Sequence, residues 1–595
     1  MRLIPAIAAA LILLAAFEPH SARAGDLGTV KPVLSCAALK QADIEAAVGS
    51  ATRIESAATM QSGGKAEYCR VRGVISPAVR FEVQLPVARW TQRFVQTGCG
   101  GLCGQLDIHL DKAETCKPAQ NGELVLASTD MGHQGGMDGT WGRTNYQARV
   151  DFAYRGVHVT TLAAKALIER YYGQKARFAY FFGCSDGGRE ALMEAQRYPQ
   201  DFNGIIAGAP AMNFTTQNSF FHGWNAVQNQ HSDGSPILTA DKLAILHGAV
   251  ISQCDAQDGL RDGLISDPLA CHPDLSKITC AVGQGTDTCL TAEQVHVANE
   301  IYRGAHDSAG RGLVISGPLP GSEINWVGVY VPPPGQSGSM SQMTAEGTIR
   351  NLDSDPNPPA DFKLRDFRFD QANFVATTRL HALYDSTDTD LTAFAKAGGH
   401  LILWHGLADP HISPMNTVAY YQGMQRVMGP QAVDALARLY LFPGGAHCGG
   451  GEGPFDFDVL TPMIDWVEKG VEPGALIASH SSGSVGPPAG VPRGGPPPGF
   501  DPSQGPPPGA RPGMSPPTPP AASAKVDRTR PVYPYPQVAR YVGHGSIDEA
   551  TNFAASPGRP WPGNETWYGA GFFTSHEHLW CKEAAARLVC QNARD

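Results

Sequence analysis

A serine stands between two glycine-rich flanks in the stretch FFGCSDGGREAL, residues 181–192. Gly183, Ser185 and Gly187 form the pattern G-x-S-x-G, which follows an apolar run and precedes a helix-forming run. On such a strand–turn–helix junction the serine backbone is strained and its hydroxyl is exposed above the sheet, where it can act as a nucleophile. The alternative is an ordinary turn in which Ser185 caps the helix. The flanking context favours the nucleophile.

A nucleophilic serine needs a base and an acid that orients the base. On this type of turn they follow the serine in the order acid, then histidine. Asp409 stands in WHGLADPHISP and His447 in FPGGAHCGGG, each just after a strand-like run. Each could be an ordinary loop residue, but their joint order and placement predict the triad Ser185, Asp409 and His447. His405 ranks second as the base and is otherwise expected to bind substrate.

The oxyanion that forms when serine attacks a carbonyl needs two backbone N–H donors. One is expected from Asp186, the residue after the serine. The other is expected from the loop TGCGGLCGQ, residues 97–105, in which Gly100 and Gly101 are equal candidates. The alternative for this loop is a tight turn without a catalytic role.

Cysteines flank both reactive candidates: Cys184 precedes the serine and Cys448 follows the histidine. If these two are bonded, the disulfide fixes the distance between serine and histidine; two free buried thiols are the alternative. The chain has 13 cysteines but no C-x-x-C pair, which argues against a zinc ribbon or a thioredoxin-like site.

Strand-like and helix-like runs alternate around these residues, which predicts a large α/β domain with a parallel sheet. Ligand chemistry in such sheets gathers at the carboxyl ends of the strands. From 212 to 390 this rhythm gives way to a region rich in Gly, Pro, Asp and Cys, which predicts an insertion. Strands are expected at 78–86, 92–98, 122–129, 176–183, 203–210, 398–406 and 437–443, and helices at 150–173, 187–199, 413–427 and 456–469.

Several segments are expected to lie outside the catalytic core. Residues 1–24 combine a basic residue, an apolar run and Ala-Arg-Ala, which predicts a secretory signal peptide; an uncleaved anchor is disfavoured because the run is too short. Residues 479–524 are rich in Pro and Gly and predict a disordered insert. The remaining segments are assigned as hydrolase core (25–211 and 391–478), lid (212–390) and a C-terminal tail that packs on the core (525–595).

Charge and hydropathy argue against two kinds of partner. The formal net charge is −10 and no basic stripe is present, which disfavours nucleic acid. Beyond the signal peptide no apolar run is long enough to span a membrane. We therefore expect a secreted or periplasmic protein that acts on a small molecule and whose cysteines are mostly oxidised.

Three segments together resemble the tannase and feruloyl esterase family, of which mono(2-hydroxyethyl) terephthalate hydrolase is a relative: GCSDGGREALMEAQRYPQDFNGIIAGAPA, HGLADPHISPMNTVAYY and PGGAHCGGGEGPFDFDVL. The resemblance covers nearly all of the mature chain except the Pro-rich stretch and the extreme tail. It implies an α/β-hydrolase fold with a large inserted lid domain. It also implies the triad named above and the disulfide Cys184–Cys448.

The lid segment CDAQDGLRDGLISDPLAC, residues 254–271, holds four aspartates among glycines. Closely spaced carboxylates suit Ca²⁺, although a solvated acidic loop agrees equally well with the spacing alone. The resemblance favours the ion and implies a structural calcium that stabilises the lid without acting as a Lewis acid. Its implied ligands are the side chains of Asp255, Asp258 and Asp262 and the backbone carbonyls of Leu260 and Leu264.

The other cysteines are assigned beside these. Cys254–Cys271 would close the acidic loop and Cys280–Cys289 the next loop, while Cys36–Cys69 would lie near the N-terminus and Cys581–Cys590 in the C-terminal extension. For the remaining three cysteines we expect Cys103–Cys116, with Cys99 free.

These features predict a carboxylic ester hydrolase that forms an acyl-enzyme on Ser185. The resemblance implies an aromatic acyl group, such as gallate or a hydroxycinnamate like ferulate. A terephthalate-monoester hydrolase is the nearest alternative. A non-catalytic binding protein on the same scaffold, and a serine peptidase or acyltransferase with the same serine turn, are the alternatives from other classes.

Overall fold

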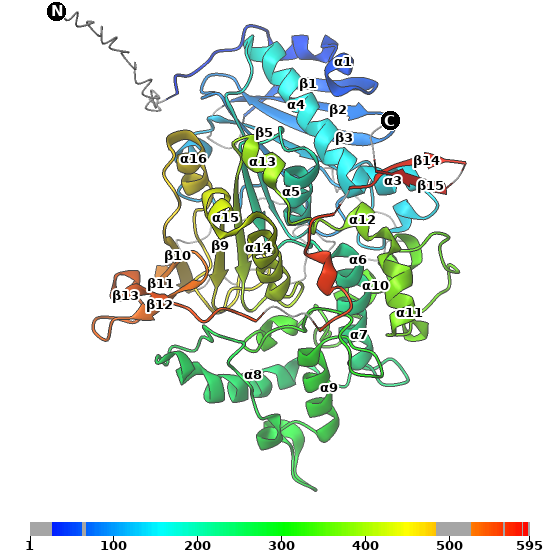
Figure 1. Ribbon diagram of the computed structural model, residues 1–595, viewed down its shortest axis with the longest axis vertical. Helices are drawn as coiled ribbons and strands as arrows, with labels where there is room; N and C mark the ends of the chain where they lie inside the picture. Colours follow the sequence, from blue (N-terminus) through cyan, green and yellow to red (C-terminus); the bar gives the residue numbers. More distant parts are fainter. Residues whose placement is uncertain are drawn as a thin grey trace, which may run out of the picture.

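A nine-stranded sheet forms the centre of the computed structural model, which describes residues 27–61, 67–482, 525–562, 566–576, 578–585 and 587–592 (Figure 1). The strand order is β1-β2-β3-β5-β4-β6-β7-β8-β9. The strands are β1 Thr52–Met60, β2 Tyr68–Ile75, β3 Val79–Pro86, β4 Arg93–Thr97, β5 Leu124–Thr129, β6 Phe178–Cys184, β7 Gly204–Gly208, β8 His400–Gly406 and β9 Ala437–Phe442. The expected signal peptide and residues 483–524 of the expected insert lie outside the described residues.

The sheet is mixed. Strands β1, β2, β3 and β5 pair antiparallel in succession, whereas β5, β4, β6, β7, β8 and β9 pair in parallel. The strands that the sequence predicts all form, and β1 and β2 are additional. Strand β1 buries only Ile54 well, so it lacks the apolar run that signals a strand in sequence.

Alternate residues of the parallel strands enter two separate cores, as the two-residue period of a strand requires. Phe181 of β6 packs in the core on the face covered by α4, α5 and α14, whereas its neighbours Tyr180 and Phe182 pack in the core on the face covered by α16. The bounds are α4 Gly156–Tyr172, α5 Asp186–Arg197, α14 Pro414–Met428 and α16 Leu460–Lys469. Burial on both faces explains why these strands are continuously apolar.

Shorter helices complete the sheet-containing part of the chain. They are α1 Glu45–Val48, α2 Lys117–Gln120, α3 Tyr146–Val150, α13 Thr392–Lys396 and α15 Pro430–Leu436. A π-helical turn over Asp151–Arg155 joins α3 to α4, so the helix expected at 150–173 contains an irregular first turn.

Between β7 and β8 the chain forms a largely helical region with a hydrophobic core of its own, in the lower part of Figure 1. Trp326 and Tyr330 are almost fully buried in that core, against α8 and α9. The helices of this region are α6 Phe214–Thr216, α7 Gly223–Gln228, α8 Ala240–Cys254, α9 Ala292–Arg303, α10 Met340–Asn351, α11 Gln371–Thr377 and α12 His381–Tyr384. The whole is an α/β-hydrolase fold with a large insertion, as the sequence predicts.

The C-terminal segment forms three two-stranded ribbons: β10 Leu476–Ser482 with β11 Lys525–Val532, β12 Gln537–Tyr541 with β13 Phe553–Pro557, and β14 Trp580–Ala584 with β15 Arg587–Gln591. Residues 479–482, expected to belong to the insert, are the end of β10. The Tyr535 N–H donates to the Leu439 carbonyl at 2.7 Å, which ties this segment to β9.

Six disulfides join described cysteines: Cys36–Cys69, Cys99–Cys103, Cys184–Cys448, Cys254–Cys271, Cys280–Cys289 and Cys581–Cys590. The expected Cys103–Cys116 bond is wrong. Cys99 and Cys103 lie on one tight turn after β4, whereas Cys116 is a buried free thiol in the core beneath α16. Sequence spacing does not reveal which face of the sheet a loop cysteine enters.

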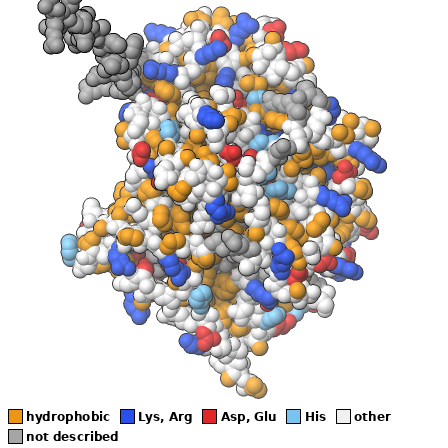
Figure 2. Space-filling model, in the orientation of Figure 1, with side chains coloured by type: hydrophobic (Ala, Val, Ile, Leu, Met, Phe, Trp, Pro, Cys, Tyr) orange, Lys and Arg blue, Asp and Glu red, His pale blue; other side chains and the backbone are white. Residues whose placement is uncertain are grey.

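The surface carries charges of both signs. On the face seen in Figure 2, Lys and Arg side chains are spread among acidic and apolar ones. Within the described part of the chain, no helix combines the length and hydropathy needed to cross a membrane.

Candidate active site

Ser185 lies at the sharp turn between β6 and α5. Its backbone has φ 64° and ψ −121°, a region that side-chain-bearing residues rarely adopt. Its N–H donates to the Gly208 carbonyl at 3.0 Å, which ties the turn to β7. The turn needs glycine because a Cβ at Gly183 would lie 2.2 Å from the Gly187 carbonyl oxygen. The strain expected of a nucleophilic serine is therefore present at Ser185.

Asp409 and His447 meet beyond the ends of β8 and β9. The Nδ1 atom of His447 lies 2.7 Å from Oδ2 of Asp409, and Asp409 has no exposed surface. Because Nδ1 is engaged by the carboxylate, Nε2 is the ring nitrogen that remains for a proton transfer. The two residues sit on loops 38 positions apart in the chain, and only the neighbouring parallel strands bring them together.

The carboxylate of Asp409 is held by two further groups in its own loop. Its Oδ1 atom accepts hydrogen bonds from the backbone N–H groups of His411 at 2.7 Å and Ile412 at 3.1 Å. Burial alone would raise its pKa, but the charges and hydrogen bonds of the neighbouring His447 and His405 keep the pKa well below its ordinary value. Asp409 is therefore ionised throughout the physiological range and can orient and stabilise a histidinium.

His405 does not have the substrate-binding role expected from the sequence. Its ring has no exposed surface, Nδ1 lies 2.7 Å from the Thr417 hydroxyl, and Nε2 lies 3.1 Å from Asp409. With both nitrogens engaged inside the protein, the ring cannot contact a substrate. It helps to hold the Asp409 carboxylate in place.

The disulfide Cys184–Cys448 joins the residue before Ser185 to the residue after His447, with their Cα atoms 6.0 Å apart. It bridges 264 positions of sequence. The serine turn and the histidine loop, which come from separate parts of the chain, are thus covalently held side by side.

The loop that follows β4 packs against the N-terminus of α5. The Gly187 N–H donates to the Cys99 carbonyl at 2.7 Å, and a Cβ at Gly98 would lie 2.5 Å from Gly187 Cα. Among the described residues, the N–H groups of Asp186, Gly100 and Gly101 donate no hydrogen bond to the protein. These three donors are therefore available, as an oxyanion hole requires.

Two residues next to Ser185 that the sequence analysis did not single out hold this region together. Arg189 has no exposed surface and binds the Asp186 carboxylate at 2.7 and 3.1 Å. Glu190 is 1% exposed, and its Oε1 atom accepts the Cys99 N–H at 3.3 Å. Both residues lie in the GGRE stretch directly after Ser185 and Asp186. Charged residues in a first helical turn are ordinarily solvated, so the sequence alone gives little sign that these two are buried.

Two more buried histidines, His411 and His222, lie beside the proposed base. The His411 ring centroid is 4.6 Å from that of His447 and 6.1 Å from that of His222. Burial, followed by the charge on His447, lowers the pKa of His222 to about 3 and lowers that of His411 well below its ordinary value. Both rings are therefore neutral at neutral pH.

The acidic lid loop uses its carboxylates partly within the protein. The Asp255 Oδ1 atom accepts the N–H groups of Asp262 and Gly263, each at 3.1 Å, and Asp262 Oδ2 pairs with Arg530 at 2.5 Å. Burial raises the pKa of Asp262, and Asp258 adds to this effect while Arg530 opposes it. A buried carboxylate with a second one beside it is an environment that a cation would stabilise.

The backbone carbonyls expected as ligands in that loop, those of Leu260 and Leu264, have no hydrogen-bond donor among the described residues. Together with the carboxylates they offer only hard oxygen donors, which fits Ca²⁺ rather than a softer metal.

Two groups of potential metal ligands lie close together among the described residues, and both are otherwise engaged; the lid aspartates do not form such a group. Cys99 and Cys103 are joined in a disulfide beside Asp186 and Glu190. His158, Glu194 and Asp201 form the second group, in which the Lys165 ammonium lies 3.4 Å from Asp201 and already supplies a positive charge.

Comparison with known proteins identifies the family. A model of the family described as "Tannase and feruloyl esterase" matches residues 64–556. The chain belongs to the tannase and feruloyl esterase family. Mono(2-hydroxyethyl) terephthalate hydrolase of Piscinibacter sakaiensis is 29% identical over 571 residues, which cover 85% of this chain and 88% of that protein.

Other members of the tannase and feruloyl esterase family are similar over a large share of their length. A probable feruloyl esterase B-1 of Aspergillus flavus is 31% identical and covers 71% of this chain and 80% of its own. The crystal structure of feruloyl esterase B from Aspergillus oryzae superposes with a TM-score of 0.68 at 25% identity, covering 85% of this chain and 97% of that one. Membership of this family makes the chain a carboxylic ester hydrolase.

Proposed function

We propose that the protein hydrolyses esters of aromatic acids through an acyl-enzyme on Ser185. The observation that carries the proposal is the hydrogen bond between Asp409 and His447, held beside the strained Ser185 by the Cys184–Cys448 disulfide. Nucleophilic catalysis requires a serine, a histidine base and an acid that orients the base, and these observations support that assignment.

In the first half of the reaction, His447 Nε2 accepts the Ser185 hydroxyl proton while Oγ attacks the ester carbonyl. The carbonyl oxygen becomes an oxyanion, for which the N–H of Asp186 and that of Gly100 or Gly101 are the proposed donors. The tetrahedral intermediate expels the alcohol, which receives the proton from His447. The acyl group then remains on Ser185 as an ester.

In the second half, His447 deprotonates a water molecule that attacks the acyl-enzyme. The same oxyanion donors stabilise the second intermediate, and its collapse releases the carboxylic acid and returns the proton to Ser185. Asp409 stays ionised throughout, since its pKa is far below neutrality, and it stabilises the His447 cation in both halves.

The aromatic acyl group is proposed from the relatives, whose printed names include feruloyl esterase, tannin acyl hydrolase and a terephthalate-monoester hydrolase. Ferulate and gallate esters are the first substrates to test. Terephthalate monoesters are the second, because the relative that carries that name covers 85% of this chain.

A calcium ion is proposed in the lid, held by the carboxylates of Asp255, Asp258 and Asp262 and the carbonyls of Leu260 and Leu264. When bound, it would supply positive charge that stabilises this loop, and no catalytic step involves it. We also place the protein outside the cytosol, since six disulfides join its described cysteines and such bonds persist in oxidising compartments.

The test is a hydrolysis panel with the wild type and the Ser185→Ala variant on methyl ferulate, methyl gallate, a terephthalate monoester and p-nitrophenyl acetate. We expect the wild type to cleave at least one aromatic ester and the variant to lose this activity by at least about 10³-fold. Equal activity of the two proteins would refute the role of Ser185. Amide analogues of the best substrate and an added alcohol acceptor distinguish a peptidase and an acyltransferase.

A further inference from the structure

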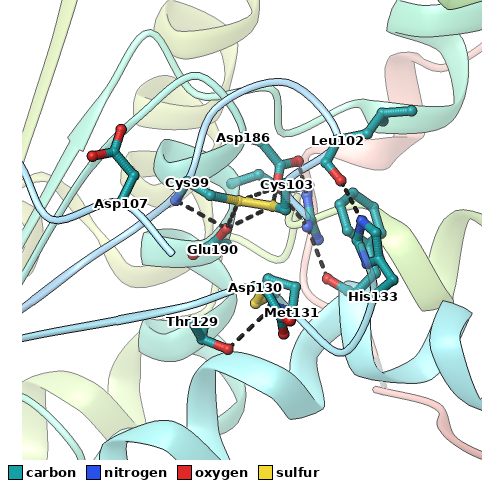
Figure 3. The surroundings of a disulfide bond; sticks show 12 residues. Cys99, Leu102, Cys103, Asp107, Thr129, Asp130, Met131, His133, Asp186 and Glu190 are labelled. Carbon is teal, nitrogen blue, oxygen red and sulfur yellow. Dashed lines mark hydrogen bonds and ion pairs between the residues drawn. A yellow bond between two sulfur atoms is a disulfide. The ribbon is translucent and has the colours of Figure 1, made fainter. Parts of the chain in front are cut away.

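The turn over residues 98–103, which we call the oxyanion loop, is held to helix α5 on both sides of Cys99. The Cys99 carbonyl accepts the Gly187 N–H at 2.7 Å, and the Cys99 N–H donates to Glu190 Oε1 at 3.3 Å. Figure 3 shows the Glu190 carboxyl lying directly beneath the Cys99–Cys103 disulfide. Two successive peptide planes are thereby fixed, since each is rigid.

The peptide plane between Cys99 and Gly100 is the one that matters for catalysis. The Cys99 carbonyl and the Gly100 N–H belong to one planar peptide group, so the bond that fixes the carbonyl also fixes the direction of the N–H. Gly100 is one of the two candidates for the second oxyanion donor. Its aim therefore depends on how firmly Cys99 is held to α5.

Glu190, which holds Cys99 to α5, is an unusual residue because its carboxyl group is buried. It is 1% exposed, and its Oε2 atom accepts no hydrogen bond from the described residues. Burial, and then the nearby Asp186 carboxylate, raises its pKa well above the ordinary value. Burying a carboxyl group costs free energy, and the contacts of Glu190 with the oxyanion loop offset part of that cost.

The sulfur atoms of the loop rest on the same carboxyls. Cys99 Sγ lies 2.8 Å from Glu190 Oε1, and Cys103 Sγ lies 3.3 Å from Asp186 Oδ2. On its other side the loop is supported by His133, whose Nε2 atom lies 2.7 Å from the Leu102 carbonyl. The loop is therefore clamped between α5 and the segment after β5, and Glu190 is the side chain that holds the peptide plane just before that of Gly100.

We propose that Glu190 is a positioning residue of the oxyanion hole, which acts by accepting the Cys99 N–H and so aims the Gly100 N–H at the reacting carbonyl oxygen. This proposal rests on the proposed function of Ser185. Removal of an entire oxyanion donor costs about 10²- to 10³-fold in kcat. Loosening the support of one donor should lower kcat by a smaller factor, and we expect a decrease of about 10- to 100-fold.

Three variants test the proposal. Glu190→Leu fills the same space without an acceptor, and Glu190→Gln keeps a neutral acceptor for the Cys99 N–H. The matched control is Glu194→Leu, since Glu194 lies one turn further along α5, is also fully buried, and accepts no hydrogen bond from the described residues. The control reports the effect of replacing a buried glutamate in this helix without touching the loop.

The measurements are kcat and KM for the best ester of the panel, inhibition by an arylboronic acid, and inhibition by the product acid. The boronic acid forms a tetrahedral adduct that uses the oxyanion donors, whereas the product acid does not need them. For Glu190→Leu we expect kcat and boronate affinity to fall together by about 10- to 100-fold, with KM and product affinity within about 3-fold of the wild type. Glu190→Gln should recover most of kcat.

The proposal is overturned if Glu190→Leu keeps the wild-type kcat, or if Glu194→Leu loses as much kcat as Glu190→Leu. It is also overturned if Glu190→Gln is no better than Glu190→Leu. If the leucine variant does not fold, Glu190→Ala replaces it with the same expectations. Loss of activity in Ser185→Ala but not in Glu190→Leu refutes this proposal alone, whereas full activity of Ser185→Ala refutes the proposed function itself.

Discussion

His247 connects the lid to the loop that carries His447, the proposed base, and its protonation should govern how firmly the lid and this loop are joined. On α8, its Nδ1 atom lies 2.6 Å from Glu323 Oε2 and its Nε2 atom lies 2.9 Å from Glu452 Oε2. Glu452 follows His447 by five positions, and the Tyr302 hydroxyl donates to the other oxygen of Glu323 at 2.5 Å. A doubly protonated imidazole satisfies both carboxylates at once.

The magnitude follows from the pKa of His247. Burial would lower it, but the hydrogen bonds and charges of Glu323 and Glu452 outweigh burial and raise the pKa to about 9. Relative to an ordinary value of about 6.5, this corresponds to about 3 kcal/mol at 1.4 kcal/mol per pKa unit. Glu452 is 48% exposed, so solvent screens its share, and about 2 kcal/mol is the expected contribution.

The sign follows from the direction of the shift. Because the folded pKa is higher than the unfolded pKa, the stabilisation is fully present below about pH 6.5 and is lost as the pH rises through about 9. Hydrogen exchange read by mass spectrometry on peptides of α8, corrected for intrinsic rates, measures this locally. Between pH 6 and pH 10 we expect protection of α8 to fall by about 30-fold in the wild type, as 2 kcal/mol implies.

His247→Gln should remove this pH dependence, giving α8 the lower protection at both pH values. The matched control is His231→Gln, since His231 is a half-exposed lid histidine whose Nδ1 atom lies 3.5 Å from Glu293. The control should behave like the wild type. Equal pH dependence of α8 protection in the wild type and in His247→Gln would refute the reasoning.

Four further outcomes are expected. Asp409→Asn should lower kcat by about 10⁴-fold with little change in KM, measured by steady-state kinetics, because the neutral amide cannot stabilise the His447 cation. Replacing Cys184 and Cys448 together by serine should lower stability to denaturant by about 2–5 kcal/mol, and an unchanged midpoint would contradict a structural role for this bond. Calcium chelation should lower the melting temperature of the wild type, whereas in Asp258→Asn the chelator should have a smaller effect. Trp326→Ala should destabilise the lid by about 3–5 kcal/mol, seen as early exchange of α8, since this ring is fully buried.

Much of the catalytic core follows from local sequence patterns. The parallel strands β6 to β9 are continuous apolar runs bounded by glycine or proline, and their order along the chain determines which loops share the carboxyl edge of the sheet. For that reason Ser185, Asp409 and His447 could be named from sequence. The fold class and the family follow from the same stretches, and both are confirmed.

The errors fall where contacts come from segments distant in sequence. The position of His405 close to Asp409 is visible in sequence, whereas the burial of its ring against Thr417 is not. Sequence spacing suggests a Cys103–Cys116 bond because it does not show on which side of the sheet a cysteine lies, and the fold places Cys116 in the opposite core. Strand β1 is not predicted from the sequence because an edge strand that buries one residue has no apolar pattern.

The sequence by itself determined the chemistry: a serine, an acid and a histidine, each following a buried strand, in an order and a glycine-rich context that suit an ester hydrolase. Only the tertiary structure decided which neighbours tune that chemistry. Glu190 lies under the oxyanion loop, His411 lies beside His447, and His247 joins the lid to the catalytic loop. A side chain's burial and partners depend on packing between distant segments, and no local pattern encodes them.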